Sequence, residues 1–282
     1  MSDLEGYGKI YETTYWGDGR DNTIDWGIVY KNLGADSTDA DYQSVLDRAT
    51  ALGYQAPQTD QQELQNTLVT SLKSAGVWDK LDLFYVFASD GDSDFATLNW
   101  KAPSSFQISK VSSPTFTTDV GFSGNGTSSY LDTDYTPSDD GNNYTQDAAS
   151  FGFFISSLGS STSTALSDFG SPDVANRSWY RRSADRFYFN SSEFVQRTAY
   201  SANVFVHANR STASNTQIIH NGVTKDNNTE HDSTGLPIAS FTAFKRSTTF
   251  ADSTLGIAFV GGDLSTEASD FYDAINTYLT AI

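Results

Sequence analysis

The 282-residue chain contains no cysteine, so neither disulfide bonds nor thiolate metal sites can stabilise it. Proline is scarce, at six residues, and no apolar run approaches the roughly eighteen residues that a membrane-spanning helix needs. We therefore expect no membrane insertion. Basic residues are also few, because 17 Lys and Arg stand against 35 acidic residues, giving a net charge of −18. Such a surface repels a phosphate backbone, and we expect no nucleic-acid partner.

Asp dominates the acidic residues, and only six of the 35 are Glu. This bias is typical of loop-rich β proteins, in which Asp forms turns and caps. Hydrophobic residues make up 38% of the chain and aromatic residues 14%, which is enough for a globular core. Short apolar runs separated by Ser, Thr, Asn, Asp and Gly favour an all-β fold.

The spacing of the apolar runs predicts an antiparallel two-sheet sandwich. The predicted strands lie at residues 81–88, 151–158, 186–192, 203–211, 216–222, 240–246 and 255–262. Asn221-Gly222 predicts a tight hairpin turn. Helical patterns occupy the stretch from a cap at Ser37 or Thr38 to Gly53, the stretch from Thr59 or Asp60 to Gly76, and residues 265–282. We divide the chain into an N-terminal aromatic segment (1–33), a helical linker or brace (34–77) and a β-sandwich with a C-terminal helix (78–282).

The N-terminal segment contains an aromatic repeat. The sequence Tyr-Gly-Lys-Ile-Tyr at 7–11 returns as Trp-Gly-Ile-Val-Tyr at 26–30. Tyr and Trp are favoured at protein interfaces because they bury a large area at small entropic cost. We predict that this segment anchors the protein in a larger assembly; the alternative is that its aromatics cap the hydrophobic end of their own sandwich. The anchoring residues would be Tyr7, Tyr11, Trp16, Trp26 and Tyr30.

Three later stretches resemble a known family. VWDKLDLFYVFASD, NWKAPSSFQISKVSSPTFTTDVGFSGNGTSSYLDTDYTPS and the ending GIAFVGGDLSTEASDFYDAINTYLTAI resemble the concanavalin A-like or laminin-G-like jelly-roll domain of tailed-phage virion proteins, over about residues 57–282. The aromatic-Gly N-terminus is similar to short attachment segments of phage fibre, tail and head-decoration proteins.

This resemblance implies a structural virion protein of a tailed virus: a head-decoration, fibre or tail-associated protein assembled in the host cytoplasm. Its partners would be capsid, neck or tail proteins, and it would be a homotrimer. The sandwich would face outward, with attachment to host-surface glycans as one role. Two alternatives stay open, a virion-borne polysaccharide depolymerase and a free lectin.

The sequence offers no catalytic constellation, and we do not expect an enzyme. The β-glucanases that share this sandwich place acid and nucleophile in a Glu-x-Asp-x-x-Glu pattern, and no two of the six Glu lie close enough in sequence to form it. There is no His-Glu-x-x-His motif and no Gly-x-Ser-x-Gly elbow. His207, His220 and His231 are not at metal-ligand spacing.

Two ligand sites are conceivable. The basic and aromatic cluster Trp179, Tyr180, Arg181 and Arg182 could stack on and pair with an anionic glycan. The alternative is a core strand whose arginines pair with nearby Asp. No cofactor is required, although Ca²⁺ could bind at an acidic rim, and the alternative there is a solvated turn. The candidate ligands for Ca²⁺ are Asp132, Asp134, Asp139 and Asp140.

Overall fold

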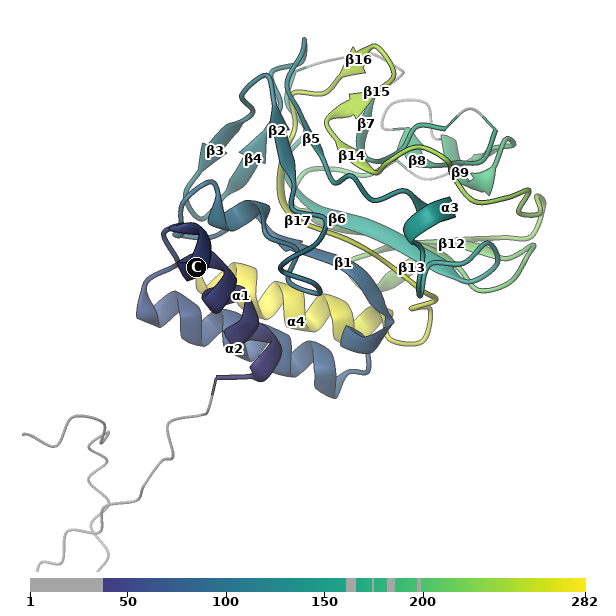
Figure 1. Cartoon of the computed structure of the whole chain (residues 1–282). Coiled ribbons are helices and arrows are strands. Elements are labelled where there is room, and N and C mark those ends of the chain that lie inside the picture. The colour runs from purple at the N-terminus through teal and green to yellow at the C-terminus, as the bar shows by residue number, and fades with distance from the viewer. Residues whose placement is uncertain (1–37, 161–165, 174, 182–185, 197–198) are drawn as a thin grey trace, which may run out of the picture. The chain divides into compact units, whose positions relative to one another are not determined.

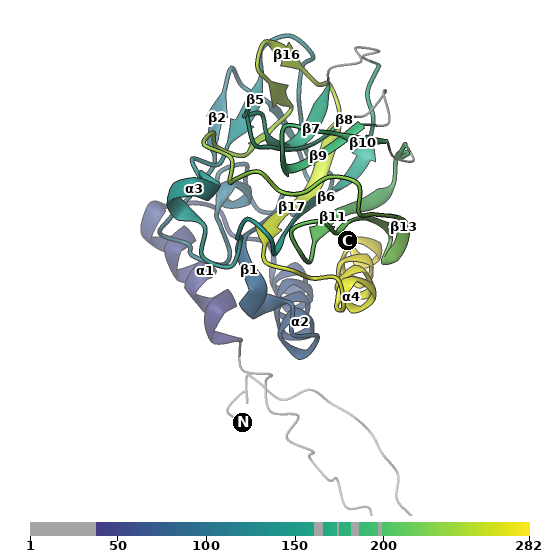
Figure 2. The same ribbon diagram turned by 90° about the vertical axis from the view of Figure 1, so that its right-hand side faces the viewer.

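The structure is a computed structural model of the chain and describes residues 38–160, 166–173, 175–181, 186–196 and 199–282. One compact unit runs from Asp39 to Ile282. In it, antiparallel strands form two main sheets, and three helices lie along one face of the larger sheet (Figures 1 and 2). The predicted fold class, an antiparallel two-sheet sandwich of the jelly-roll kind with helices before it and at its C-terminal end, is confirmed.

The larger sheet has eight strands. Seven follow the order β13-β12-β11-β6-β17-β4-β3, and β1 pairs with β17 beyond the short stretch that β4 occupies. Their bounds are β1 (Leu81–Val86), β3 (Thr115–Thr117), β4 (Gly121–Ser123), β6 (Ala149–Ser157), β11 (Val204–Arg210), β12 (Thr216–His220), β13 (Val223–Asn228) and β17 (Thr254–Gly261).

The smaller sheet has seven strands in the order β10-β9-β8-β7-β14-β5-β2. Their bounds are β2 (Ser109–Val111), β5 (Tyr130–Asp132), β7 (Ser167–Ser171), β8 (Arg177–Arg181), β9 (Arg186–Ser191), β10 (Val195–Gln196) and β14 (Thr242–Ala243). A separate hairpin joins β15 (Lys245–Arg246) and β16 (Thr249–Phe250).

Both faces of the central strands β6, β11 and β17 of the larger sheet are largely buried, which explains their continuous apolar runs. Along β17, Leu255, Ala258 and Val260 belong to the core between the sheets. Ile257 and Phe259 belong to the second core, beneath the helices. The helices that cover this face are α1 (Ala40–Leu52), α2 (Thr59–Ser74) and α4 (Ala268–Ala281). No helix in the described part of the chain is long and apolar enough to cross a membrane.

Local sequence signals account for the ends of α1 and for the hairpin. The helix begins one or two residues later than expected, because Asp39 is its cap and accepts the Asp41 N–H at 2.9 Å. It ends at Gly53 as predicted, with φ at 74°. Asn221 and Gly222 adopt φ of 50° and 72° between β12 and β13, which confirms the tight turn.

The helices of the 34–77 region share a core with the sheet rather than standing apart from it. Val45 of α1 and Leu68 of α2 lie in the same apolar cluster as Phe84 of β1 and Phe271 of α4. Three short helical turns, η1 (Trp78–Lys80), η2 (Phe95–Thr97) and α3 (Pro137–Asp140), lie in the connections. The helical segments and the sandwich therefore form a single packing unit.

A buried polar network fixes how the helices sit on the sheet. The Gln65 side chain of α2 is fully buried; it accepts the Tyr42 hydroxyl at 2.7 Å and donates to the Tyr278 hydroxyl at 3.1 Å and to Ser89 at 3.2 Å. Tyr278 in turn donates to the carbonyl of Ala88 at 2.7 Å. Because the buried side-chain groups of this network have hydrogen-bond partners on one another, the network specifies one arrangement of α1, α2 and α4.

His207 is also buried, but unlike the residues of this network it has ring nitrogens without hydrogen-bond partners in the described part of the structure. Its ring lies among Phe259 and Phe271, with ring centroids 5.3 and 6.1 Å away. Burial lowers the pKa of His207 to about 4, against opposing effects of the neighbouring Asn209 side chain and of the Asp263 charge. The imidazole is therefore neutral at pH 7.

Candidate functional site

The predicted anchoring residues cannot be placed. Tyr7, Tyr11, Trp16, Trp26 and Tyr30 all lie in residues 1–37, outside the described residues. Their role stays a prediction. What the structure does place is the point at which the compact unit begins, Asp39.

The predicted stacking role of Trp179 is wrong. The residue lies in β8 and is 1% exposed. One side of its ring stacks on Tyr188, with centroids 4.7 Å apart, and the Arg246 guanidinium lies 4.1 Å from the ring centroid. A sugar cannot stack on a ring whose surface is already covered. The side chains of Tyr180 and Arg181 and the whole of Arg182 lie outside the described residues.

The four candidate calcium ligands do not form a metal site. Asp132 accepts the Ser240 hydroxyl at 2.8 Å, and Asp134 is exposed. Asp139 and Asp140 lie in α3. Across the described ranges, no group of three or more Asp, Glu or His side chains could hold a metal ion. Asp132, Asp139 and Asp140 instead accept hydrogen bonds from neighbouring backbone or hydroxyl groups.

A pocket of about 290 Å³ lies where the first strand of the larger sheet meets the loops around it. We call it the rim pocket. It combines aromatic walls with amides, carboxylates and one ammonium group, a composition typical of ligand sites. Its lining residues are Asp79, Leu81, Asp82, Lys101, Ala102, Phe106, Tyr135, Asp140, Asn142 and Asn143.

Asp82 builds one wall of the rim pocket. Its carboxylate accepts the Tyr135 hydroxyl at 2.8 Å and three successive backbone N–H groups, from Asn142 at 3.2 Å, Asn143 at 2.9 Å and Tyr144 at 2.9 Å. A carboxylate aimed at consecutive N–H groups is a strong, charge-assisted lock for a loop. Asp82 therefore holds the loop after α3 against β1, and its oxygens are fully engaged.

Phe106 supplies an aromatic wall from an unusual backbone conformation. Its φ is 54°, a region that bulky residues avoid and that recurs at functional sites. The Phe106 carbonyl is fixed by the Tyr85 hydroxyl at 2.6 Å, and its half-buried ring meets Tyr135 edge-on, with centroids 5.3 Å apart. The hydrogen bond to its carbonyl and the packing against Tyr135 therefore hold the partly exposed Phe106 in the lining of the pocket.

Lys101 is the only basic residue among those that line the rim pocket. Its ammonium lies 4.4 Å from the centroid of the Trp78 ring, and it makes no ion pair or hydrogen bond among the residues that the structure describes. Burial lowers the pKa of Lys101, and the charges of Asp41 and Asp79 oppose that shift. The pocket thus holds a half-buried cation without an acceptor, in a chain rich in carboxylates.

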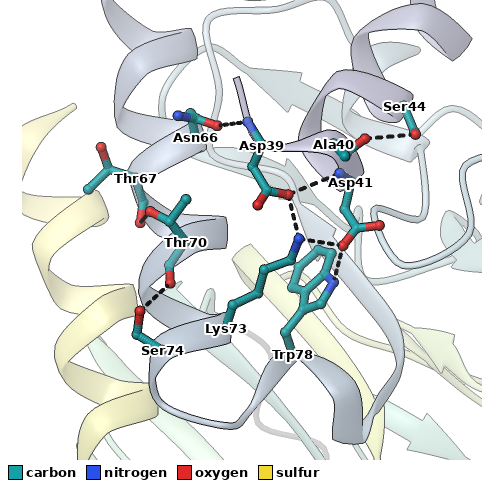
Figure 3. Close-up of polar contacts among 10 residues, drawn as sticks. All are labelled: Asp39, Ala40, Asp41, Ser44, Asn66, Thr67, Thr70, Lys73, Ser74 and Trp78. Atoms are coloured by element: carbon teal, nitrogen blue, oxygen red, sulfur yellow. Dashed lines mark hydrogen bonds and ion pairs between the residues drawn. The ribbon is translucent and has the colours of Figure 1, made fainter. Parts of the chain in front are cut away.

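A second polar cluster includes Trp78 and lies where the compact unit begins (Figure 3). We call Asp39, Asp41, Lys73 and Trp78 the N-terminal clamp. The Lys73 ammonium lies 2.6 Å from carboxylate oxygens of both Asp39 and Asp41, and the Trp78 indole N–H donates to Asp41 at 2.9 Å. The clamp ties the start of α1 to the end of α2 and to η1.

A larger groove between α2 and α4 is a weaker candidate. It measures about 460 Å³ and is lined mainly by Thr, Ser, Ala and Asp, with no aromatic side chain. The hydroxyls of Thr70, Ser74 and Thr277 donate to carbonyls of their own helices. They are therefore committed within the helices, and the rim pocket is the better site.

Comparisons with known proteins support the fold. No protein-family model matches the chain, and no curated protein matches it in sequence. A botulinum neurotoxin type C structure, described by cell entry that depends on interaction with two ganglioside molecules, aligns with 72% of this chain and 53% of its own, at 10% identity and a TM-score of 0.50. At that identity the likeness shows the sandwich fold alone.

Two further solved structures align at lower scores. Trypanosoma rangeli sialidase aligns with 77% of this chain and 39% of its own, at 9% identity and a TM-score of 0.49. Domain 4 of a GH43 extracellular arabinanase from Geobacillus stearothermophilus, in complex with arabinotriose, aligns with 68% of this chain and 98% of its own, at 12% identity and a TM-score of 0.43. The chain thus spans less than two thirds of the sialidase and neurotoxin chains.

Proposed function

We propose that this protein is a virion component of a tailed virus that displays a glycan-binding β-sandwich. The observation that supports the binding role is the rim pocket, whose lining combines the partly exposed ring of Phe106 with hydrogen-bond donors and acceptors. Glycan sites pair an aromatic face with polar groups in this way. The carbohydrate-binding proteins that share the sandwich are in line with this role.

The proposal is binding without hydrolysis. Glycoside hydrolysis needs two carboxyl groups that are free to donate a proton and to attack or activate water. In the rim pocket, Asp82 already accepts four hydrogen bonds, and Asp140 accepts the Thr136 N–H at 2.8 Å. Asp82 is thus committed to positioning the loop after α3 and one oxygen of Asp140 to α3, which suits recognition better than acid–base chemistry.

The virion role rests on the N-terminal segment. Its aromatic repeat resembles virion-attachment segments, and it directly precedes the clamp where the compact unit starts. In this proposal the segment docks on capsid, neck or tail proteins, the chain forms a homotrimer, and the sandwich faces outward. Docking through Tyr and Trp is physically reasonable because these side chains dominate interface energies.

Immunogold labelling of purified virus particles, with an antibody against residues 78–282, tests the virion role. Regular labelling at one position on the particle is the expected result. Unlabelled particles, with the protein free in the lysate, would overturn it.

Adsorption tests the binding role. The purified full chain should compete with particles for host cells, and Phe106→Ala should compete poorly. The matched control is Phe116→Ala, because Phe116 is also a half-buried phenylalanine but lies outside the pocket. Equal competition by the two variants would count against the rim pocket as the binding site.

A further inference from the structure

We infer that the rim pocket selects an uncharged sugar ring and discriminates against acidic sugars, with Lys101 as the residue that donates to the ligand. This inference rests on the proposed glycan-binding function and specifies the class of sugar. It differs from the sequence-based expectation, in which basic residues around Trp179 would meet an anionic glycan.

The charge of the pocket argues against an acidic ligand. Asp79, Asp82 and Asp140 line it with three carboxylates, against the one ammonium of Lys101. The whole chain adds to this field with a net charge of −18. A sialic or uronic acid would bring a further carboxylate into a half-enclosed site of the same sign, where repulsion is less screened than in water.

The hydrogen-bonding groups that remain available match hydroxyls rather than a carboxylate. Lys101 offers N–H donors, with no acceptor among the described residues. One oxygen of Asp140 accepts the Thr136 N–H, while its other oxygen accepts no hydrogen bond within the described residues. Each sugar hydroxyl both donates and accepts, so adjacent hydroxyls can satisfy Lys101 and Asp140 together. A carboxylate can only accept.

The apolar wall matches the C–H face of a sugar ring. Phe106, whose backbone φ is 54°, contributes a half-buried ring to the pocket, and Ala102 also lines it. The ring cannot withdraw easily, because the Phe106 carbonyl is fixed by Tyr85 and the ring is packed edge-on against Tyr135. A preorganised wall reduces the entropic cost of binding.

The test is a glycan array probed with the purified full chain, followed by titration of one uncharged oligosaccharide and its sialylated form. The uncharged form should bind at least tenfold more tightly. Phe106→Ala and Lys101→Met should each weaken that binding about tenfold or more. Phe116→Ala and Lys245→Met are the matched controls; Lys245 also places its ammonium over an aromatic ring, that of Tyr130 at 3.8 Å, but outside the pocket.

A charge variant separates selectivity from a general loss of binding. Asp79→Asn combined with Asp140→Asn keeps the side-chain shapes and removes two negative charges, so it should narrow the preference for the uncharged form. Melting temperatures show that each variant is folded.

Preference for acidic glycans, or no effect of the rim variants on binding, would overturn this inference and leave glycan binding intact. Binding to no glycan at all would overturn the proposed function itself.

Discussion

Two lysines flank the same tryptophan and are treated differently by the fold. Lys73, on one side of Trp78, contacts two carboxylates at 2.6 Å (Figure 3). Lys101 lies 4.4 Å from the Trp78 ring centroid and contacts no carboxylate at ion-pair distance within the described ranges. The first lysine closes the N-terminal clamp, and the second is left open in a pocket.

The two lysines are expected to play different roles. A paired lysine contributes to the stability of the unit, and its removal leaves carboxylates unmatched. In the proposed function, Lys101, which lies over the Trp78 ring without a carboxylate partner among the described residues, donates to a ligand instead. Substituting each of these side chains, together with one buried histidine, gives a separate prediction.

The largest effect should follow from removing the shared tryptophan. Trp78 is 2% exposed and belongs to the core beneath the helices, so Trp78→Ala should lower the free energy of unfolding by about 3–5 kcal/mol. Trp78→Phe retains much of the buried ring but loses the hydrogen bond to Asp41, and should cost much less. Urea denaturation of the two variants checks this; equal losses would show that the ring is not what matters.

The buried side chain of His207, which does not line the rim pocket, should affect stability and not binding. Because the pKa of His207 falls from 6.5 to about 4 on folding, stability is fully present above about pH 6.5 and declines as the pH falls toward 4. The loss should reach roughly 3 kcal/mol at or below pH 4. His207→Leu should remove this part of the acid sensitivity, measured by denaturation from pH 7 to 4. An unchanged pH profile would contradict the assignment.

Removing the open lysine should affect binding and leave folding intact. Lys101→Met should weaken binding of an uncharged oligosaccharide about tenfold, which corresponds to roughly 1.4 kcal/mol. Its free energy of unfolding should change by less than about 1 kcal/mol, because no ion pair is lost and a half-buried charge is removed, which offsets the lost contact of the ammonium with the Trp78 ring. Calorimetric titration and urea denaturation of the same preparation measure the two effects.

Removing the paired lysine, Lys73, should lower stability and leave binding unchanged, and this effect should be the smallest of the four. Lys73 is one third exposed, so Lys73→Met should lower the free energy of unfolding by about 1 kcal/mol or less at pH 7, with sugar affinity unchanged. Burial works against both charges, but the pairing prevails: it lowers the pKa of Asp39 and raises that of Lys73.

The contribution of the clamp should therefore be present between about pH 4 and 10 and be lost outside that range. It disappears as the pH falls through the lowered pKa of Asp39, or rises through the raised pKa of Lys73. A difference between wild type and Lys73→Met that persists at pH 2.5 would contradict the ion-pair explanation.

The strands that could be predicted from sequence are those with apolar residues on both faces. The segments 151–158 and 255–262 correspond to β6 and β17, shifted by one or two residues. The strands β2 to β5 are not predicted, because each is three residues long and interrupted by polar residues or Gly, so no apolar run marks them. Their positions are set by pairing with strands distant in sequence, such as β17 and β14.

The candidate site was less accessible to sequence reasoning. The basic residues beside Trp179 in sequence predict a ligand site, yet it is Arg246, from a distant segment, that covers the Trp179 ring. One signal for the rim pocket was present: Asp82 interrupts the apolar run LDLFYVFA, and a charge there requires partners. Nothing in the sequence indicated that Phe106 would take a positive φ, because loop geometry depends on contacts such as the one with Tyr85.

The most direct test is one pair of measurements on two variants, the affinity for an uncharged oligosaccharide and the free energy of unfolding of Lys101→Met and Lys73→Met. Loss of affinity in Lys101→Met alone, and loss of stability in Lys73→Met alone, is the predicted result. Equal affinities in the two variants, or a loss of stability confined to Lys101→Met, would contradict the assignment of the rim pocket as the binding site.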